Sequence, residues 1–283
     1  MDELILDILK QLRDGSQGAL DTHQLEMLIN SHNSGIDSSA HSTERKKLIP
    51  KRAILPYFLQ VKQNNDELWQ SWNVTPELEE RFIRSVRMKP RRTASGVATI
   101  TVITRPHTCS SNCIYCPCDL RMPKSYLANE PACQRAELTF FDPYVQVAAR
   151  LQALHQMGHS TDKVELIVLG GTWSDYPESY QYWFIKELFR ALNEWPNSPS
   201  HIQERFDWYT SFGLQNSEEA LSSFVVEQQA AVFDDTVTYN QAFHKLYDTS
   251  QPHQSAWSQM QSTYDELVEQ QHVNETAAAR VVG

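Results

Sequence analysis

The sequence predicts an α/β fold, a partial parallel (β/α) barrel of two to three βα units preceded by a small helical N-terminal domain. Two short runs rich in β-branched residues, 97–104 and 164–169, are each followed by an unusual loop and a helical pattern. Reactive loops of parallel barrels lie at the C-terminal ends of strands, as both of these loops do. We expect residues 1–90 to form the helical domain and residues 91–283 the incomplete barrel.

Composition sets the class of protein. The chain has 283 residues, 41% of them apolar, which is enough for a real hydrophobic core. The acidic start has no signal-peptide pattern, and no apolar run reaches membrane-spanning length, so we expect a cytoplasmic protein. An odd number of cysteines, five, with three crowded together, fits metal chemistry in a reducing compartment better than a disulfide scaffold.

The N-terminal domain is predicted to be helical. Apolar residues recur at helical spacing over 4–12 and 20–29, and the Ser-rich segment 31–44 is expected to be a mobile loop. A basic cluster at 45–52 is either a nucleic-acid contact or the solvated start of a helix. Thr75 and the proline after it predict a capped helix that ends near Met88.

In the barrel region we expect both strands to be buried on both faces, because both are rich in apolar β-branched residues. The segment from Cys116 to Phe141 is predicted to be a long loop. The remaining predictions are helices over 142–158, 178–194, 217–231, 238–248 and 253–272, and the opening of a third strand at 281–283. We interpret the aromatic residues between 217 and 248 mainly as core.

Three cysteines follow the first strand at CxxxCxxC spacing: Cys109, Cys113 and Cys116. Three thiolates at this spacing can ligate three irons of a 4Fe-4S cluster and leave the fourth iron open. An open iron can bind the amino and carboxylate groups of S-adenosylmethionine. Two alternatives remain, a zinc site completed by Cys118 or His107, and three thiols without a metal.

Gly170-Gly171-Thr172 follows the second strand directly, so backbone groups there can approach a ligand closely. The motif is weak alone, because a tight strand-to-helix turn has the same sequence. Beside a cysteine loop it predicts a binding site for the methionine end of the cofactor. Lys163 precedes the same strand, and on its spacing alone it is a surface lysine.

Although the formal net charge is −10, the window from Arg81 to Cys118 contains no acidic residue. It can meet phosphates, or it is a solvated basic turn. Its basic residues are Arg81, Arg84, Arg87, Lys89, Arg91, Arg92 and Arg105.

Several runs together with the cysteine loop resemble the bacterial form of the Elongator catalytic subunit family, which modifies the wobble uridine of transfer RNA. The runs are Arg91–Val97, Arg121–Leu127, Asp142–Tyr144, Asp162–Glu165 and Leu169–Trp173. The resemblance is dense over residues 80–195 and resumes at 274–283.

This resemblance implies a radical SAM barrel and a radical mechanism. A 4Fe-4S cluster would cleave S-adenosylmethionine, and the resulting radical would activate acetyl-CoA for addition to C5 of uridine. Cys109, Cys113 and Cys116 match the family's cluster ligands, and Lys163 matches its acetyl-CoA-contacting lysine. Transfer RNA would meet the basic surface that contains Arg84, Arg87, Lys89, Arg91 and Arg92.

Two departures from the family matter. Cys118 and Cys133 are extra thiols, and Cys118 can compete as a ligand. The family also continues through the rest of the barrel into an acetyltransferase domain, which is absent here. We therefore expect an N-terminal portion, either a gene fragment or half of a split gene completed by a separate chain, and inactive alone. The rival hypotheses are a non-catalytic tRNA-binding remnant and a radical enzyme with another substrate.

Overall fold

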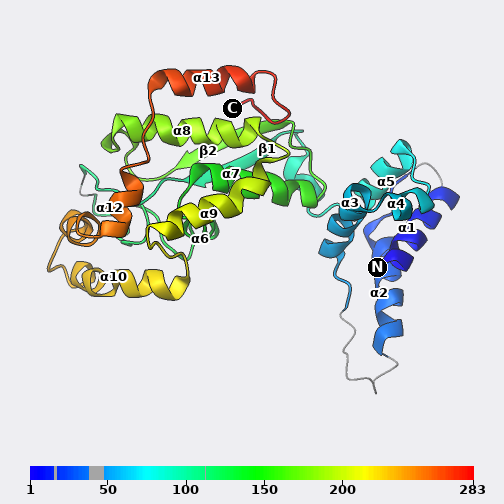
Figure 1. The fold of residues 1–283 in the computed structure, drawn as a ribbon. Coiled ribbons are helices and arrows are strands. Elements are labelled where there is room, and N and C mark those ends of the chain that lie inside the picture. Colours follow the sequence, from blue (N-terminus) through cyan, green and yellow to red (C-terminus); the bar gives the residue numbers. More distant parts are fainter. Residues whose placement is uncertain (16–17, 38–47, 112) are drawn as a thin grey trace. The chain divides into compact units, whose positions relative to one another are not determined.

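The computed structural model describes residues 1–15, 18–37, 48–111 and 113–283 (Figure 1). The chain divides into two compact units. Unit 1 contains residues 1–96 and 153–160, and unit 2 contains residues 97–152 and 161–283. None of the helices in these described ranges is both long enough and apolar enough to cross a membrane.

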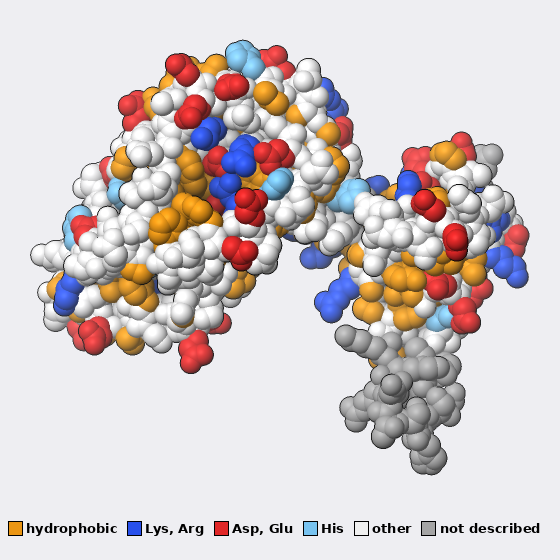
Figure 2. Space-filling model, in the orientation of Figure 1, with side chains coloured by type: hydrophobic (Ala, Val, Ile, Leu, Met, Phe, Trp, Pro, Cys, Tyr) orange, Lys and Arg blue, Asp and Glu red, His pale blue; other side chains and the backbone are white. Residues whose placement is uncertain are grey.

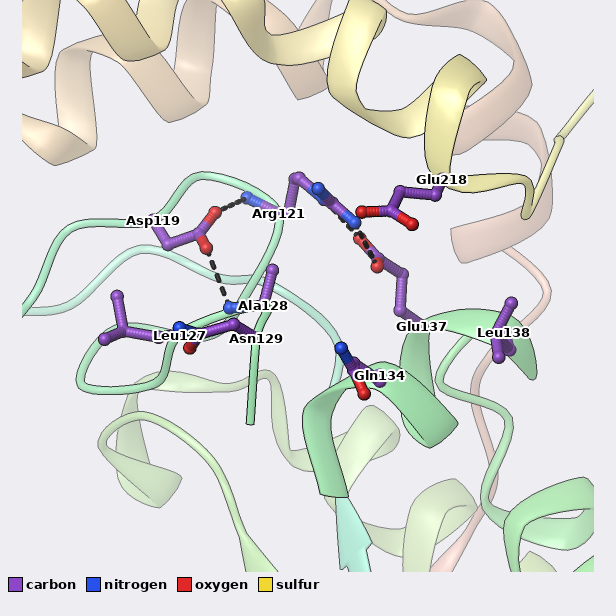
Figure 3. Close-up of a pocket in the computed structure, with 9 residues that line it drawn as sticks. All are labelled: Asp119, Arg121, Leu127, Ala128, Asn129, Gln134, Glu137, Leu138 and Glu218. Carbon is purple, nitrogen blue, oxygen red and sulfur yellow. Dashed lines mark hydrogen bonds and ion pairs between the residues drawn. The ribbon is translucent and has the colours of Figure 1, made fainter. Parts of the chain in front are cut away.

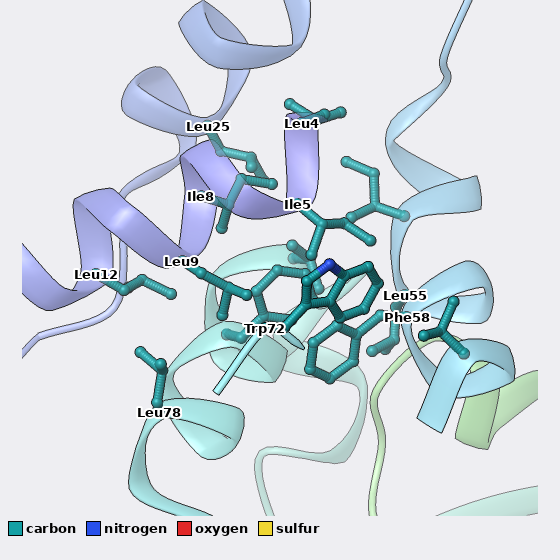
Figure 4. Packing of buried hydrophobic residues seen from close by; sticks show 14 of the residues in the cluster. Leu4, Ile5, Ile8, Leu9, Leu12, Leu25, Leu55, Phe58, Trp72 and Leu78 are labelled. Carbon is teal, nitrogen blue, oxygen red and sulfur yellow. The ribbon is translucent and has the colours of Figure 1, made fainter. Parts of the chain in front are cut away.

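Unit 1 is helical around one hydrophobic core. Phe58 lies at its centre and stacks on Phe82 and Trp72, with ring centroids 4.1 and 5.9 Å apart, while apolar side chains of the first helix pack around them (Figure 4). Stacked aromatic pairs of this kind stabilise a core beyond the area they bury. The helices are α1 (Asp2–Asp14), α2 (Thr22–Asp37), α3 (Ile54–Asn64), α4 (Asp66–Ser71) and α5 (Pro76–Val86), with short 3₁₀ turns at Lys51–Ala53 and Pro90–Thr93.

The capped helix predicted from Thr75 is confirmed. Thr75 Oγ1 accepts a hydrogen bond from the Leu78 amide at 3.2 Å, and α5 ends at Val86 before the left-handed Lys89 and Pro90. The prediction of a loop over 31–44 is wrong for residues 31–37, which continue α2. The rest of that segment and the first three residues of the basic cluster, 45–47, lie outside the described residues.

Unit 2 contains a parallel sheet in the order β1-β2-β3. The strands are β1 (Ala98–Ile103), β2 (Lys163–Leu169) and β3 (Arg280–Val281). Ala98 pairs with Val164, and Lys163 pairs with Arg280. All three strands were predicted, and the third begins one residue earlier than expected. The α/β class is therefore confirmed at the level of a small three-stranded parallel sheet.

The prediction that both strands are buried on both faces is wrong. Thr99 is exposed, and its hydroxyl donates to Glu165 across the strand pair at 3.0 Å. In β2, Ile167 and Val168 are each 37% exposed, whereas Val164 is fully buried. Successive side chains of a strand point to opposite faces, and β-branched residues favour a strand whether or not both faces are covered.

Helices surround the sheet in unit 2, and α8 and α13 lie side by side (Figure 1). The helices predicted at 142–158, 178–194 and 217–231 are present within a few residues, and the one predicted at 238–248 is α11 followed directly by a π-helical turn at His244–Asp248. In chain order the helices are α6 (Pro131–Leu138), α7 (Pro143–Gln156), α8 (Glu178–Asn193), α9 (Ile202–Ser211), α10 (Glu218–Phe233), α11 (Tyr239–Phe243), α12 (Gln251–Trp257) and α13 (Tyr264–Asn274).

Two predictions of local structure in unit 2 are wrong. The expected long loop contains α6, and the single helix expected over 253–272 is two helices. The second of them starts at a capping box, in which Thr263 Oγ1 accepts from the Glu266 amide and Glu266 Oε2 accepts from the Thr263 amide. A Thr-x-x-Glu sequence is a recognised helix start, so this break was readable from the sequence.

A network of charged side chains joins α8 and α9, and Figure 2 shows acidic and basic groups gathered over these helices. Arg205 forms ion pairs with Asp142 at 2.9 Å and with Glu187 at 2.8 Å. Arg190 contacts the same Glu187 at 3.3 Å. Asp142 and Glu187 are buried, so removing one partner would leave a buried charge uncompensated.

Candidate metal and ligand site

The three clustered cysteines lie in the loop that leaves the C-terminal end of β1. Residues 104–111 and 113–130, the described part of that loop, contain neither helix nor strand. Cys109 is buried, Cys116 is half-buried and Cys113 is exposed, and all three are free thiols. The three thiols of this loop therefore differ in solvent exposure, and the loop begins at the end of a strand.

The structure brings the cysteine loop and the glycine loop together. Cys109 Sγ lies 3.3 Å from the hydroxyl oxygen of Thr172, which follows β2. Asp175, three residues further on, accepts a hydrogen bond from the Ser110 amide at 2.7 Å. This hydrogen bond from the backbone lowers the pKa of Asp175. The two loops thus meet at the C-terminal ends of adjacent parallel strands.

The sulfur atoms themselves point to different neighbours. Cys116 Sγ is 3.0 Å from the hydroxyl of Ser125, and Cys118 Sγ is 3.5 Å from the carbonyl oxygen of Cys116. Across the ranges that the structure describes, no three Cys, His, Asp or Glu side chains are gathered to hold a metal ion. Thiols are the type of ligand that an iron–sulfur cluster requires. The three sulfur atoms would have to come closer to one another to hold such a cluster.

Gly170 occupies a position that accepts no side chain. A Cβ atom there would lie 2.0 Å from the hydroxyl oxygen of Thr104 at the end of β1. That hydroxyl is 2.8 Å from the hydroxyl of Tyr176, which in turn donates to the carbonyl oxygen of Arg105. Burial raises the pKa of Tyr176 to about 12, so it stays protonated as a donor. The glycine lets the two strand ends approach closely.

A cavity of about 360 Å³ opens beside the glycine loop. This volume is in the range of small-molecule sites, which span roughly 300–1,000 Å³. Gly170 and Gly171 line it with backbone alone, and the hydroxyls of Tyr126 and Tyr176 interact with that backbone. Its lining is Thr104, Tyr126, Val168, Leu169, Gly170, Gly171, Trp173 and Ile185.

Lys163 is not part of this constellation. It is the first residue of β2, and it is exposed. Gly170 follows the last residue of the same strand, which places the two at opposite ends of β2, on the order of 20 Å apart at about 3.3 Å per residue. The structure therefore separates Lys163 from the cysteine loop.

Four of the five basic residues predicted to contact nucleic acid are exposed in unit 1: Arg84, Lys89, Arg91 and Arg92. Arg87 is half-buried, and Arg84 forms an ion pair with Glu80 one helical turn earlier. The other three exposed side chains form no ion pair with an acidic group in the described part of the chain. They are free to meet phosphates.

Arg105 was grouped with these residues, and that prediction is wrong. Only 7% of the residue is exposed. The guanidinium carbon lies 4.0 Å from the ring centroid of Trp257 and 4.7 Å from that of Tyr180. Arg105 is therefore an internal cation held against aromatic rings, and burial lowers its pKa.

His107, the alternative zinc ligand, is engaged elsewhere through one nitrogen. Its Nε2 donates to the carbonyl oxygen of Asp175 at 2.9 Å, and its ring stacks on Tyr176 with centroids 4.7 Å apart. Its Nδ1 is buried and has no hydrogen-bond partner among the described residues. Burial, with a contribution from Arg105, lowers the pKa of His107 to about 4, so the ring is neutral at physiological pH.

A second hollow, of about 570 Å³, lies beside the loop and was not predicted (Figure 3). Asp119 fixes the backbone on one side of the hollow, because its carboxylate accepts hydrogen bonds from the backbone amides of Arg121 and Ala128. Arg121 forms a two-point ion pair with Glu137 of α6. The start of α10, with Glu218, closes the hollow from a segment about 100 residues later, which no local pattern signals.

No family model matches the chain. Curated relatives do match part of it. The chain is 44% identical over 126 residues to the tRNA uridine(34) acetyltransferase of Methanocaldococcus infernus, covering 42% of this chain and 24% of the relative. It is 48% identical over 105 residues to the enzyme of the same name from Dehalococcoides mccartyi, covering 37% of this chain and 23% of the relative.

A third relative carries the Elongator name. The chain is 41% identical over 127 residues to Elongator complex protein 3 of Schizosaccharomyces pombe, covering 41% of this chain and 23% of that protein. The chain thus spans about a quarter of the length of the curated relatives it matches. Over about two fifths of its length, the chain is similar to proteins named tRNA uridine(34) acetyltransferase and Elongator complex protein 3.

Proposed function

We propose that this chain takes part in modification of the wobble uridine of transfer RNA, using a 4Fe-4S cluster and S-adenosylmethionine. Its relatives are named tRNA uridine(34) acetyltransferases, which supports the substrate. The contact of Cys109 Sγ with the hydroxyl of Thr172 supports the chemistry most strongly. It joins Cys109, one of the three candidate cluster ligands, to the glycine loop, and Gly170 and Gly171 of that loop line a cavity.

Each part of the constellation has a proposed role. Cys109, Cys113 and Cys116 would hold the cluster, which when bound supplies one electron to open S-adenosylmethionine. The backbone of Gly170 and Gly171 would bind the methionine end of that cofactor and orient it. Lys163 would bind acetyl-CoA at the other end of β2, where its exposed ammonium can meet an anionic ligand.

We propose that the exposed basic residues of unit 1 bind the phosphates of transfer RNA. Lys89, Arg91 and Arg92 are the first candidates, because they stand close together in sequence without an acidic partner among the described residues. Replacing Arg91 and Arg92 with Ala should weaken tRNA binding and reduce the slope of log affinity against log salt by about 0.7–0.9 for each phosphate that is no longer neutralised. Arg135→Ala, an exposed arginine of α6, is the matched control.

A complete reaction would need protein beyond the matched segment, because the relatives are about four times as long as that segment. We propose that further barrel strands and an acetyltransferase domain act with this part, supplied in the same or a separate chain. The cytoplasm, where transfer RNA is modified, is the proposed location.

Anaerobic reconstitution with iron and sulfide tests the proposal. The wild-type chain should take up iron and give an electron paramagnetic resonance signal after reduction. Cys113→Ala should abolish the signal, and Cys118→Ala should retain it, since only the first removes a proposed ligand. A signal equal in Cys113→Ala and wild type would contradict the ligand assignment. Transfer RNA binding by a chain that takes up no iron would support a non-catalytic tRNA-binding protein instead.

A further inference from the structure

Two side-chain amides from distant helices hold the backbone of the cysteine loop. Asn240 of α11 donates through Nδ2 to the carbonyl oxygen of Cys109 at 2.8 Å and accepts at Oδ1 from the Cys109 amide at 3.1 Å. Gln229 of α10 donates through Nε2 to the carbonyl oxygen of Cys118 and accepts at Oε1 from the Leu120 amide, both at 2.8 Å. Each side-chain amide thus pairs with one backbone N–H and one backbone carbonyl group of the loop, as the backbone of a neighbouring strand would.

Two buried tyrosines hold the same loop further along. The hydroxyl of Tyr247 donates to the carbonyl oxygen of Leu120 at 2.7 Å, and that of Tyr239 donates to the carbonyl oxygen of Met122 at 3.0 Å. Burial raises the pKa of both tyrosines, so both hydroxyls keep the proton that they donate. Their rings pack with Leu120 and Phe243 in one hydrophobic cluster, which fixes the helices against the loop.

Besides the two hydrogen bonds of Gln229, a hydrogen bond of Arg121 connects the loop to α10. Its guanidinium lies between Glu137 and the first turn of α10 (Figure 3), and Nη1 donates to the hydroxyl of Ser222 at 2.9 Å. The loop is therefore tied to α10 and α11 by polar contacts from Cys109 to Met122. We call Gln229, Tyr239, Asn240 and Tyr247 the loop clamp.

The loop clamp holds both ends of the metal-ligating segment and leaves its middle open. Asn240 fixes the residue at one end, Cys109, and Gln229 fixes the backbone just beyond Cys116 at the other. Between these points Ile114 is 90% exposed and Tyr115 is 94% exposed. Within the segment, the Ser110 amide donates to Asp175 and Lys124 donates to the carbonyl oxygen of Ser111. The motion that would gather the sulfurs is therefore expected mainly in residues 113–116.

We propose that Asn240 and Gln229 are positioning residues that preorganise the cysteine loop for its cluster. This inference rests on the proposed function, because it assigns the cysteines as ligands. Ordering a free loop costs conformational entropy for each residue, so fixing its ends before the cluster binds reduces that cost. Neither residue touches a sulfur atom in the structure, and both act through the backbone.

Hydrogen exchange of the metal-free chain tests the loop clamp directly. Asn240→Ala should speed exchange of the Cys109 amide about tenfold, since it removes both hydrogen bonds to that residue. Asn240→Asp keeps an acceptor for the Cys109 amide and should have a smaller effect. Gln229→Ala should speed exchange of the Leu120 amide in the same way.

The matched control is Asn216→Ala. The amide of Asn216 also donates to a backbone carbonyl, that of Leu138, but outside the cysteine loop. It should leave exchange of residues 109–122 unchanged. If Asn240→Ala and Gln229→Ala both leave this exchange at the wild-type rate, the proposal is wrong. Should either Ala variant fail to fold, as judged by circular dichroism, Asn240→Asp and Gln229→Glu decide the question by the same measurement.

Iron uptake separates this inference from the proposed function. Asn240→Ala should weaken iron uptake about tenfold relative to wild type and Asn216→Ala, at equal folded content. Uptake by Asn240→Ala equal to wild type would contradict the positioning role even if exchange changes. Wild-type protein that takes up no iron would contradict the proposed function, and the exchange rates would then overturn or support the loop clamp by themselves.

Discussion

Gly170 is the residue on which the approach of the two strand ends depends most directly. An added Cβ would lie 2.0 Å from Thr104 Oγ1, whereas at Gly171 the nearest atom would be 3.8 Å away. We expect Gly170→Ala to lower the free energy of unfolding by about 1–3 kcal/mol, as overpacking does, and Gly171→Ala to change it by less than about 0.5 kcal/mol. Urea denaturation of both variants measures the difference. Equal stabilities would show that Thr104 moves away freely.

His253 should make stability depend on pH. Burial lowers its pKa from 6.5 to about 4, with a smaller contribution from Arg105. Between these values the unfolded chain binds the proton and the folded chain does not, so this contribution is complete above pH 6.5 and is lost as pH falls toward 4.

Replacing His253 with Phe, which keeps a ring against Phe224, should reduce the loss of unfolding stability between pH 6.5 and 4, while His107 continues to contribute to it. Thermal melts at half-unit pH steps provide the measurement. His272→Gln, at an exposed histidine, is the control and should keep the wild-type profile. An unchanged slope in His253→Phe would place the pH dependence elsewhere.

Single residues were predictable where their chemistry is local. Cys109 and Thr172 follow neighbouring strands, so their meeting at one sheet edge follows from parallel topology. The position of Arg105 was not predictable. A basic window has the same sequence pattern whether its side chains face solvent or pack against aromatic rings, as Arg105 does against rings of α8 and α12. Those rings lie 75 and 152 residues further along the chain.

Among the elements, β2 offers the sharpest test of how the sheet is covered. Val164 is fully buried and Val168 is 37% exposed on the same strand. Val164→Thr should cost about 1–3 kcal/mol, since it places a hydroxyl in the core, and Val168→Thr less than about 0.5 kcal/mol. Chemical denaturation of the pair compares them. Both side chains lie on the same face of the strand, so equal losses would mean that the end of this face that bears Val168 is also covered in solution.

Helix boundaries were predictable where a cap is encoded next to the helix. Thr75 before Pro76 marked α5 correctly, and Thr263 with Glu266 marks α13 by the same rule. The helix α6 was missed because Pro131 opens it within a polar segment that lacks a long apolar stripe. The length of the apolar pattern and the capping residues therefore predicted helices better than the polarity of a segment did.

At the scale of the whole molecule, the least predictable feature is the attachment of α10 and α11 to the cysteine loop. The interpretation of the aromatic residues of this region mainly as core is confirmed for Tyr239, Phe243 and Tyr247, which are buried, whereas Phe233 is exposed. That this core lies against the cysteine loop depends on contacts 109 to 131 residues apart. Periodicity records which face of a helix is buried and not which segment covers it.

Electron paramagnetic resonance of the reduced, reconstituted chain, recorded before and after addition of S-adenosylmethionine, tests the central claim most directly. A cluster held by Cys109, Cys113 and Cys116 would leave one iron without a protein ligand, so binding of the cofactor should change the spectrum. Cys118→Ala should respond as wild type does. The absence of a cluster signal, or a signal that S-adenosylmethionine leaves unchanged, would contradict this assignment.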